Sequence, residues 1–227
     1  MTMPSVKFCG ITRVQDAELA VSLGAWAVGM ILWPGSPRAV TVDEAIELRA
    51  AVGRGAEAVG VFHNQTLQEV AAVADAAGLT ILQMHGQEGP VFCAEAARRT
   101  GCRVIKAARI QTGADIHALA PFHTNFHLLD SHVPGIPGGT GETFEWGLAA
   151  DYRRLIPRQR GAEPVPLILS GGLRPANVSA AITEVGPFAV DVASGVESAP
   201  GIKDHGLMRE FATAVADSFA LTPQSPA

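Results

Sequence analysis

Short hydrophobic runs of five to seven residues recur along the whole chain, and Ala-rich amphipathic stretches separate them. The runs are hydrophobic at almost every position and do not alternate with polar residues. Strands of this kind are buried on both faces, as in a parallel sheet covered by helices. The runs that we expect to form strands are SVKFC (5–9), WAVGMIL (26–32), EAVGVF (57–62), TILQM (80–84), RVIKAA (103–108), FHLLD (126–130), PLILS (166–170) and FAVDVAS (188–194).

Eight strands that alternate with helices are compatible with two architectures. A doubly wound open sheet usually has fewer strands and a GxGxxG turn after the first, and this turn is absent from the chain. A closed (β/α)8 barrel, or TIM barrel, fits the number of runs, and 227 residues is a normal length for it. We therefore predict an α/β protein with a single-domain (β/α)8 barrel over residues 1–217 and a flexible tail over residues 218–227.

Glycine ends several of the helical stretches, and we expect it to adopt the left-handed conformation that terminates many helices. The stretches are VQDAELAVSLG, DEAIELRAAVG, LQEVAAVADAAG and PVFCAEAARRTG, which end at Gly24, Gly53, Gly78 and Gly101. A loop rich in Gly and Pro follows the sixth strand and leads to a helix that we expect to start near Phe144. In a barrel, this loop would lie over the catalytic face.

Charge and cysteine content exclude several classes of function. The formal net charge is −5 and no basic cluster occurs, so we expect no nucleic-acid partner. No hydrophobic run is long enough to span a membrane, and we expect no signal peptide. An odd number of cysteines, three, fits a cytoplasmic protein, and the absence of CxxC and of zinc-like histidine spacing predicts no metal. Whether the protein is a monomer or a homodimer stays open.

Barrel enzymes place their active sites at the carboxyl ends of the strands, so Cys9, at the end of the first strand, is a candidate for chemistry. Lys7 shares its face, because side chains two residues apart in a strand point the same way. If both point into the barrel, the ammonium would lower the pKa of the thiol. The alternative for Cys9 is a small buried core residue. We interpret Cys93 and Cys102 as packing residues.

Two aspartates lie in strongly hydrophobic strands. Asp130 ends the sixth strand, where a carboxylate is either functional or a cap for the following loop. Asp191 lies within the eighth strand, and because a lone buried charge is prohibitive, we expect it to pair with an inward cation such as Lys7. His127 has the opposite parity from Asp130, so it should face the helices.

Glycine-rich turns follow the last two predicted strands. LSGGLRPANV closes the seventh strand with Gly171 and Gly172 and should open a helix near Pro175, and VASGVESAPG closes the eighth in the same way with Ser194 and Gly195. Barrels frequently bind phosphate between these two loops, through backbone amides that glycine allows to approach the anion. Ordinary tight turns are the alternative, but the two turns together favour a phosphate site.

Three further polar residues lie near strand ends. Arg38, in a loop that prolines bracket, is either a solvated surface residue or a ligand for a substrate carboxylate. His85 and Lys106 are candidates for direct contact with a substrate on pattern alone.

Several segments together resemble the phosphoribosylanthranilate isomerase family of tryptophan biosynthesis. The resemblance extends from about residue 5 to residue 211, and its motifs are specific in combination, since SPR or SGG alone would mean little. The matching segments are VKFCGIT (6–12), SPR (36–38), VGVFHN (59–64), LQMHG (82–86), LLDS around Asp130, GGTGETFEW (138–146), LSGGLRPANV (169–178) and VDVASGVESAPGIKD (190–204).

The resemblance implies an Amadori rearrangement of N-(5-phosphoribosyl)anthranilate to 1-(2-carboxyphenylamino)-1-deoxyribulose 5-phosphate, without a cofactor. It assigns the general base to Cys9, the general acid to Asp130 and the anthranilate carboxylate to Arg38. The other residues that we expect to bind this phosphorylated sugar substrate are His85, Asp191, Gly171, Gly172, Ala193, Ser194 and Gly195. Two positions depart from the family pattern: Ala193 replaces a frequent Ser, and Glu142 replaces a common Lys.

Three other functions stay open at this point. A Schiff-base aldolase would use Lys106 as its nucleophile. A barrel that only binds a ligand would leave Cys9 and Asp130 without a role. A related isomerase acting on an aminoimidazole carboxamide ribotide would generally use two aspartates, and Cys9 argues against that reading.

Overall fold

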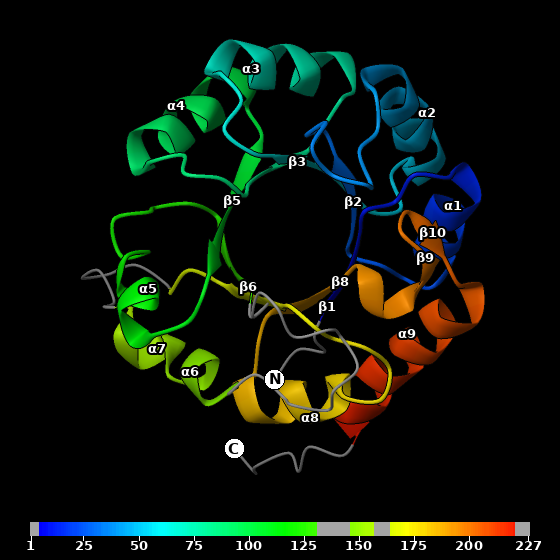
Figure 1. Ribbon diagram of the computed structural model, residues 1–227, viewed down its shortest axis with the longest axis vertical. Helices are drawn as coiled ribbons and strands as arrows, with labels where there is room; N and C mark the ends of the chain where they lie inside the picture. The colour runs from blue at the N-terminus through cyan, green and yellow to red at the C-terminus, as the bar shows by residue number, and fades with distance from the viewer. Residues whose placement is uncertain (1–4, 131–145, 157–163, 221–227) are drawn as a thin grey trace.

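Parallel strands close into an eight-stranded barrel, and helices surround it (Figure 1). The computed structural model describes residues 5–130, 146–156 and 164–220. The predicted (β/α)8 barrel is confirmed, and each predicted strand bound lies within two residues of the observed one. The strands of the barrel are β1 (Ser5–Cys9), β2 (Ala27–Ile31), β3 (Glu57–Phe62), β4 (Ile81–Met84), β5 (Arg103–Arg109), β6 (Phe126–Asp130), β7 (Leu167–Ser170) and β8 (Ala189–Val192).

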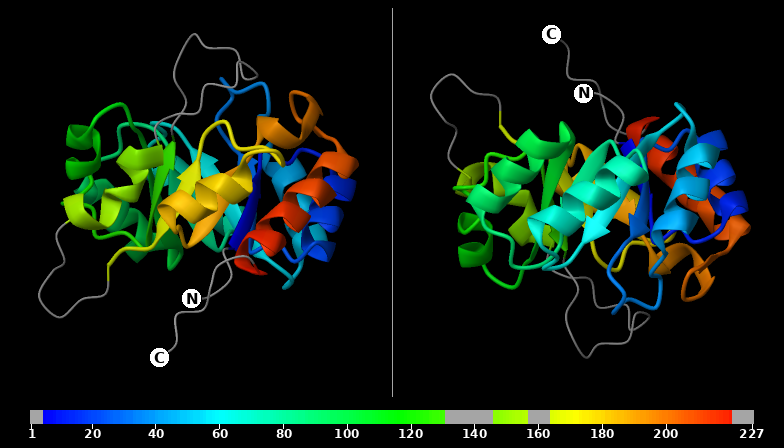
Figure 2. Two further views of the ribbon diagram at one scale, coloured as in Figure 1. Left: turned by 90° about the horizontal axis from the view of Figure 1, so that it is seen from below. Right: turned by 90° about the horizontal axis from the view of Figure 1, so that it is seen from above.

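Most of the helices connect one barrel strand to the next along the outside of the barrel. The elements outside the barrel are α1 (Val14–Ser22), α2 (Val42–Val52), α3 (Leu67–Ala76), α4 (Pro90–Thr100), α5 (Gly113–His117), α6 (Trp146–Ala150), α7 (Tyr152–Leu155), α8 (Val178–Val185), the short 3-10 helix η1 (Ser194–Val196) and α9 (His205–Ala220). Figure 2 shows α8 and α9 side by side, where Ser179 Oγ donates to the Ala214 carbonyl at 2.8 Å.

Local sequence signals account for most helix ends. Thr41 and Thr66 each begin a helix with a capping box, in which the threonine hydroxyl and a glutamate three residues later satisfy each other's backbone amides. Gly101 ends α4 in the left-handed conformation, as expected. Gly53 differs, because its φ of 55° is combined with a ψ of −130°, outside the left-handed helical region.

The barrel wall separates two hydrophobic clusters. The larger one lies between the strands and the surrounding helices. The smaller one fills the interior of the barrel with the side chains of Ala27, Val59, Ile81, Ile105, Ala107, Phe126, Leu128, Ile168 and Ala189. Trp26, Phe126 and Phe188 pack edge-to-face and stacked at the amino-terminal ends of β2, β6 and β8, with ring centroids 5.1–5.4 Å apart. These rings close the end of the barrel opposite the predicted active site.

A small antiparallel hairpin between η1 and α9 was not predicted. It consists of β9 (Glu197–Ala199) and β10 (Ile202–Lys203), joined by Pro200 and Gly201. Gly201 has a φ of 80°, which fits the third position of a type II turn after proline. At the carboxyl end, α9 continues through Ala220 and Ser218 is buried, so the helix extends three residues past the expected start of the tail.

Some sequence expectations concern residues outside the described ranges. The glycine-rich loop after β6, the helix start near Phe144 and the departure at Glu142 all fall within residues 131–145. The helix α6 begins at Trp146, the first described residue after this gap.

Candidate active site

Cys9 and Lys7 both point into the barrel from β1. Gly29 lies opposite them on β2, and a methyl group added to it would come within 2.8 Å of Cys9 Sγ and 3.2 Å of Lys7 Nζ. Gly29 therefore leaves the space in which the thiol and the ammonium lie. Cys9 is 6% exposed and Lys7 is fully buried.

The Lys7 ammonium is held by Asp191, as expected. The two residues face each other across β1 and β8, and Lys7 Nζ donates to Asp191 Oδ1 at 2.7 Å. Ser170 Oγ donates to the other carboxylate oxygen at 3.0 Å. Burial lowers the pKa of Lys7, but Asp191 and Cys9 outweigh this effect, so the net shift is upward. Lys7 is therefore a cation at neutral pH.

Lys7 lowers the pKa of the Cys9 thiol, as expected, but it does not determine the net shift, which is upward. Burial raises the pKa of Cys9, the Asp191 carboxylate raises it further, and the cations Lys7 and Lys203 only partly offset these two effects. The physical reason is that burial is the largest of these effects, and the Lys7 ammonium that opposes it is also paired with Asp191, 2.7 Å away. Because its pKa is raised, the Cys9 thiol is protonated at neutral pH, although the nearby cations Lys7 and Lys203 favour its thiolate form.

Asp130 ends β6 at the same end of the barrel as Cys9, and β7 and β8 separate their strands. His85 Nε2 lies 3.6 Å from Asp130 Oδ2, and the two side chains are 37% and 19% exposed. The sequence motifs do not predict the third member of this group, Gln83. Its side-chain Nε2 donates to His85 Nδ1 at 3.0 Å, which places the ring proton of a neutral His85 on Nε2, toward Asp130.

Gln83 itself is buried inside the barrel. Its Oε1 lacks a hydrogen-bond partner, and it is the only buried side-chain oxygen or nitrogen of the described residues that does. The sequence signal for Gln83 was its polarity at an inward position of a hydrophobic strand, two residues before His85.

Arg38 is not a solvated surface residue. Its guanidinium forms a double hydrogen bond with Glu197 on β9, from Nε at 2.8 Å and from Nη2 at 2.7 Å. The aliphatic part of the side chain packs on Gly10, where a methyl group would come within 2.7 Å of Arg38 Cδ. Because Gly10 directly follows Cys9, this contact places Arg38 at the rim next to the thiol. The hydrogen bond to Glu197 is the largest contribution to the raised pKa of Arg38.

The two glycine-rich loops after β7 and β8 lie against each other. Gly195 packs so closely on the Leu173 carbonyl that no side chain fits there. Gly171 and Gly172 have φ values of 91° and 62°, and a methyl group at Gly172 would contact nothing within 4 Å. The space beside Gly172 is therefore open to an anion, and Asn177 fixes this backbone by donating to the Gly172 carbonyl at 3.1 Å.

The helices after these loops differ from the expectation. Residues 175–177 form turns, and α8 begins at Val178, three residues after the expected Pro175. The turn at Ser194 opens only the three-residue η1, because the chain continues into the β9–β10 hairpin. Backbone amides in the loops, more than helix amino termini, are available for a phosphate.

His127 and Lys106 face away from the barrel interior. His127 lies between the Phe122 carbonyl, 2.9 Å from Nε2, and the Tyr152 hydroxyl, 2.7 Å from Nδ1, as expected for a residue that faces the helices. Lys106 Nζ donates to the Gly86 carbonyl at 2.6 Å and lies 3.3 Å from Glu88. Because Lys106 is outside the barrel and bound in this way, the geometry gives no support to a Schiff-base aldolase.

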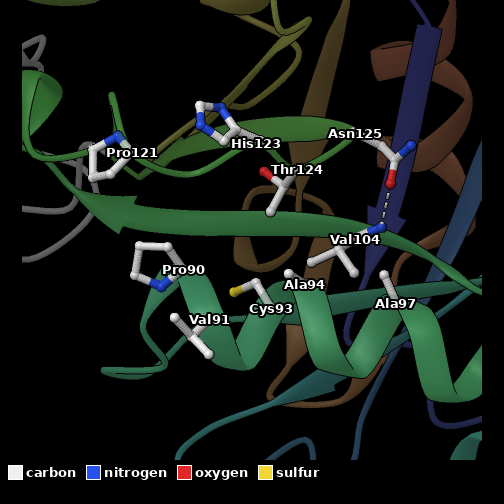
Figure 3. Close-up of a pocket in the computed structure, with 10 residues that line it drawn as sticks. All are labelled: Pro90, Val91, Cys93, Ala94, Ala97, Val104, Pro121, His123, Thr124 and Asn125. Carbon is white, nitrogen blue, oxygen red and sulfur yellow. Dashed lines mark hydrogen bonds between the residues drawn. The ribbon is translucent and has the colours of Figure 1, made fainter.

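A shallow groove of about 240 Å³ lies on the outside of the barrel, between α4 and the segment before β6 (Figure 3). Cys93 lines it together with Pro90, Val91 and Val104, which fits its interpretation as a packing residue. Within residues 5–130, 146–156 and 164–220, we find no group of three metal-binding side chains and no helix long and apolar enough to cross a membrane.

The barrel, with a buried thiol and a carboxylate at the carboxyl ends of its strands, defines a (β/α)8-barrel enzyme. Comparison with known proteins identifies which one. The family model of N-(5'phosphoribosyl)anthranilate (PRA) isomerase matches residues 6–214, and the chain belongs to this family.

Individual relatives agree with the family match. The chain is 42% identical over 210 residues to the N-(5'-phosphoribosyl)anthranilate isomerase of Magnetococcus marinus, with coverage of 92% of this chain and 94% of the relative. It is 44% identical over 207 residues to that of Azotobacter vinelandii, with coverage of 90% and 94%. The crystal structure of phosphoribosyl anthranilate isomerase from Thermotoga maritima superposes with a TM-score of 0.83 at 37% identity, covering 95% of this chain and all (100%) of that one.

Proposed function

We propose that the protein catalyses the Amadori rearrangement of N-(5-phosphoribosyl)anthranilate to 1-(2-carboxyphenylamino)-1-deoxyribulose 5-phosphate, a step of tryptophan biosynthesis. The observation that carries the proposal is the Cys9 thiol, which faces the barrel interior between Lys7 and Gly29 in a member of this family. A phosphoribosyl anthranilate isomerase structure solved with reduced 1-(o-carboxyphenylamino)-1-deoxyribulose 5-phosphate, at 35% identity and a TM-score of 0.80, supports the substrate class.

Cys9 and Asp130 are the acid–base pair in this proposal. Asp130 in its protonated form donates a proton to the ribose ring oxygen, and the ring opens to an iminium ion. The Cys9 thiolate then removes the proton from C2, which gives an enolamine that tautomerises to the ketone product. The reaction moves hydrogen atoms within one molecule, so it is balanced without an oxidant or a reductant.

The surrounding side chains favour both proton transfers. Lys7 and Lys203 stabilise the thiolate that the general base requires, against the cost of burial. His85 and Asp191 lie beside the two catalytic groups, and we assign them to the hydroxyl groups of the sugar. A substrate between β1 and β6 would then meet the acid on one side and the base on the other.

The two charged ends of the substrate have separate sites in this proposal. Arg38 would bind the anthranilate carboxylate with the edge of its guanidinium that Glu197 leaves open. The phosphate would lie between the loops after β7 and β8, on backbone amides of Gly171, Gly172, Ala193, Ser194 and Gly195.

We further propose that the barrel and its surrounding helices, through the end of α9 at Ala220, form one catalytic domain that works in the cytoplasm. The cysteines at positions 9, 93 and 102 are all free thiols, which supports a reducing compartment.

The test is to incubate the purified protein with N-(5-phosphoribosyl)anthranilate and follow the loss of anthranilate fluorescence. Consumption of this substrate, with an aminoimidazole carboxamide ribotide left unchanged in a parallel assay, is the expected result. Turnover of the second compound alone would assign the barrel to the related isomerases.

A further inference from the structure

Arg38, Glu197 and Lys203 form a cluster of charges at the rim next to Cys9. Arg38 holds both carboxylate oxygens of Glu197, and Lys203 Nζ donates to Glu197 Oε1 at 2.8 Å from another side. The Glu197 and Lys203 side chains are only 4% and 0% exposed. Because these side chains are buried, water screens their charges weakly. The contacts therefore strongly restrict the orientation of each group.

Glu197 is fixed and cannot simply swing away when a ligand arrives. Besides Arg38 and Lys203, it accepts a hydrogen bond from the Gly201 amide at 3.4 Å, within the β9–β10 hairpin. Its carboxylate is thus held by Arg38, Lys203 and Gly201 together. A substrate carboxylate would bind beside it without replacing it.

The arrangement leaves one edge of the Arg38 guanidinium for a ligand. A guanidinium has five N–H donors in a planar fork. Within the described ranges, Glu197 uses Nε and one donor of Nη2, which leaves both donors of Nη1 and one of Nη2. The cluster contains two basic side chains and one carboxylate, so the free edge still attracts a carboxylate.

Lys203 connects this cluster to the second loop of the predicted phosphate site. Its Nζ also donates to the Ala193 carbonyl at 2.9 Å, directly before Ser194 and Gly195. One buried ammonium therefore holds both the partner of Arg38 and the backbone of the loop after β8.

We propose that Glu197 and Lys203 are positioning residues of the substrate site. Glu197 fixes the plane of the Arg38 guanidinium, so that its free edge faces the anthranilate carboxylate. Lys203 fixes the position of this edge relative to the phosphate-binding loop. The inference rests on the proposed function and adds to it two residues that do not touch the reacting atoms.

The test compares two ligands on Glu197→Gln by titration calorimetry. The first ligand is reduced 1-(o-carboxyphenylamino)-1-deoxyribulose 5-phosphate, and the second is the same compound without its carboxyl group. We expect the affinity for the first ligand to fall about tenfold and that for the second to change less than about twofold, because only one of them uses Arg38. A loss of stability alone would weaken both ligands equally.

Three further variants serve as comparisons. Glu57→Gln breaks the Glu57–Arg103 ion pair of 2.6 Å at the opposite end of the barrel and should leave both affinities unchanged. Arg38→Ala should abolish the preference for the carboxylated ligand. The double variant with Glu197→Gln should show no further loss, because Glu197 acts through Arg38.

Lys203→Met tests the second half of the proposal and also serves if Glu197→Gln does not fold. It should weaken both ligands and inorganic phosphate by about threefold or more, because the Ala193 loop loses its anchor. Unchanged phosphate binding in Lys203→Met, or full preference for the carboxylated ligand in Glu197→Gln, would overturn the inference. A wild-type protein that binds neither ligand would instead overturn the proposed function.

Discussion

The Lys7 ammonium lies 2.7 Å from the Asp191 carboxylate across β1 and β8, within the interior that also holds the Cys9 thiol. This pair has two opposite effects on the thiol. The ammonium favours the thiolate, whereas the carboxylate and burial favour the neutral form. Removing the charge of either Lys7 or Asp191 should therefore change the pKa of Cys9.

Lys7→Met and Asp191→Asn should move the pH profile of kcat/KM in opposite directions. The reaction needs the thiolate, so the rate rises with pH through the pKa of Cys9. Lys7 lowers this pKa and Asp191 raises it, so the rise should shift to higher pH in Lys7→Met and to lower pH in Asp191→Asn. Shifts of the same sign in both variants would contradict the assignment of Cys9 as the base. Because each single variant leaves a buried partner unpaired, about 3–5 kcal/mol of stability is at risk, and the double variant is the folding control.

Cys9→Ala should lose nearly all turnover while it keeps its fold and its affinity for the product analogue. A general base contributes about 10²–10⁴-fold to the rate, and the cavity left by a thiol is small. Cys93→Ala is the matched control, since Cys93 is also buried but lies on α4. Turnover and melting temperature are measured for both. If Cys9→Ala kept more than about a tenth of the wild-type rate, Cys9 would be an ordinary core residue.

Asp130→Asn should also reduce turnover by about 10²–10⁴-fold, because an amide cannot donate a carboxylic proton. Asparagine keeps the shape of the side chain, so the melting temperature should change little. The effect of combining it with Cys9→Ala should be far smaller than the product of the two single effects, since the two residues act in one reaction. Single-turnover kinetics on the three variants measures this, and fully multiplicative losses would argue against a shared mechanism.

Gly195→Ala should weaken phosphate binding. The added methyl group would overlap the Leu173 carbonyl, so the loops after β7 and β8 would have to separate. We expect a raised KM, weaker binding of inorganic phosphate and a loss of about 1–3 kcal/mol of stability. Gly89→Ala is the control, because a methyl group there contacts nothing within 4 Å. Phosphate affinity equal to that of the wild type would show that the two loops do not form the site.

The barrel was predictable because eight runs that are hydrophobic on both faces alternate with helical stretches. A second rule, that buried charges must pair, predicted one contact inside it. The second rule connected Lys7 and Asp191, which are 184 residues apart. It did not give the net pKa shift of Cys9, since this depends on how burial and two opposite charges balance at one atom.

Contacts at the rim were harder to predict. Glu197 lies 159 residues from Arg38 in the sequence. Its strand has only three residues, too few to show the hydrophobic periodicity by which a strand is recognised. The Pro200–Gly201 dipeptide is a turn signal in the sequence, but we did not predict a hairpin from it. Gln83 was visible as a polar residue in a hydrophobic strand, but its contact with His85 depends on side-chain conformations that a sequence pattern does not contain.

The interior cluster from Ala27 to Ala189 and the aromatic rings at its closed end lie apart from the loops that carry Arg38, Gly172 and Gly195. The packing of the lower barrel and the choice of substrate thus depend on different ends of the same strands. An evolving lineage, or an engineer who exchanges rim loops, can alter the preferred ligand while the packing of the lower barrel stays as it is. This separation makes specificity the most adaptable property of the scaffold.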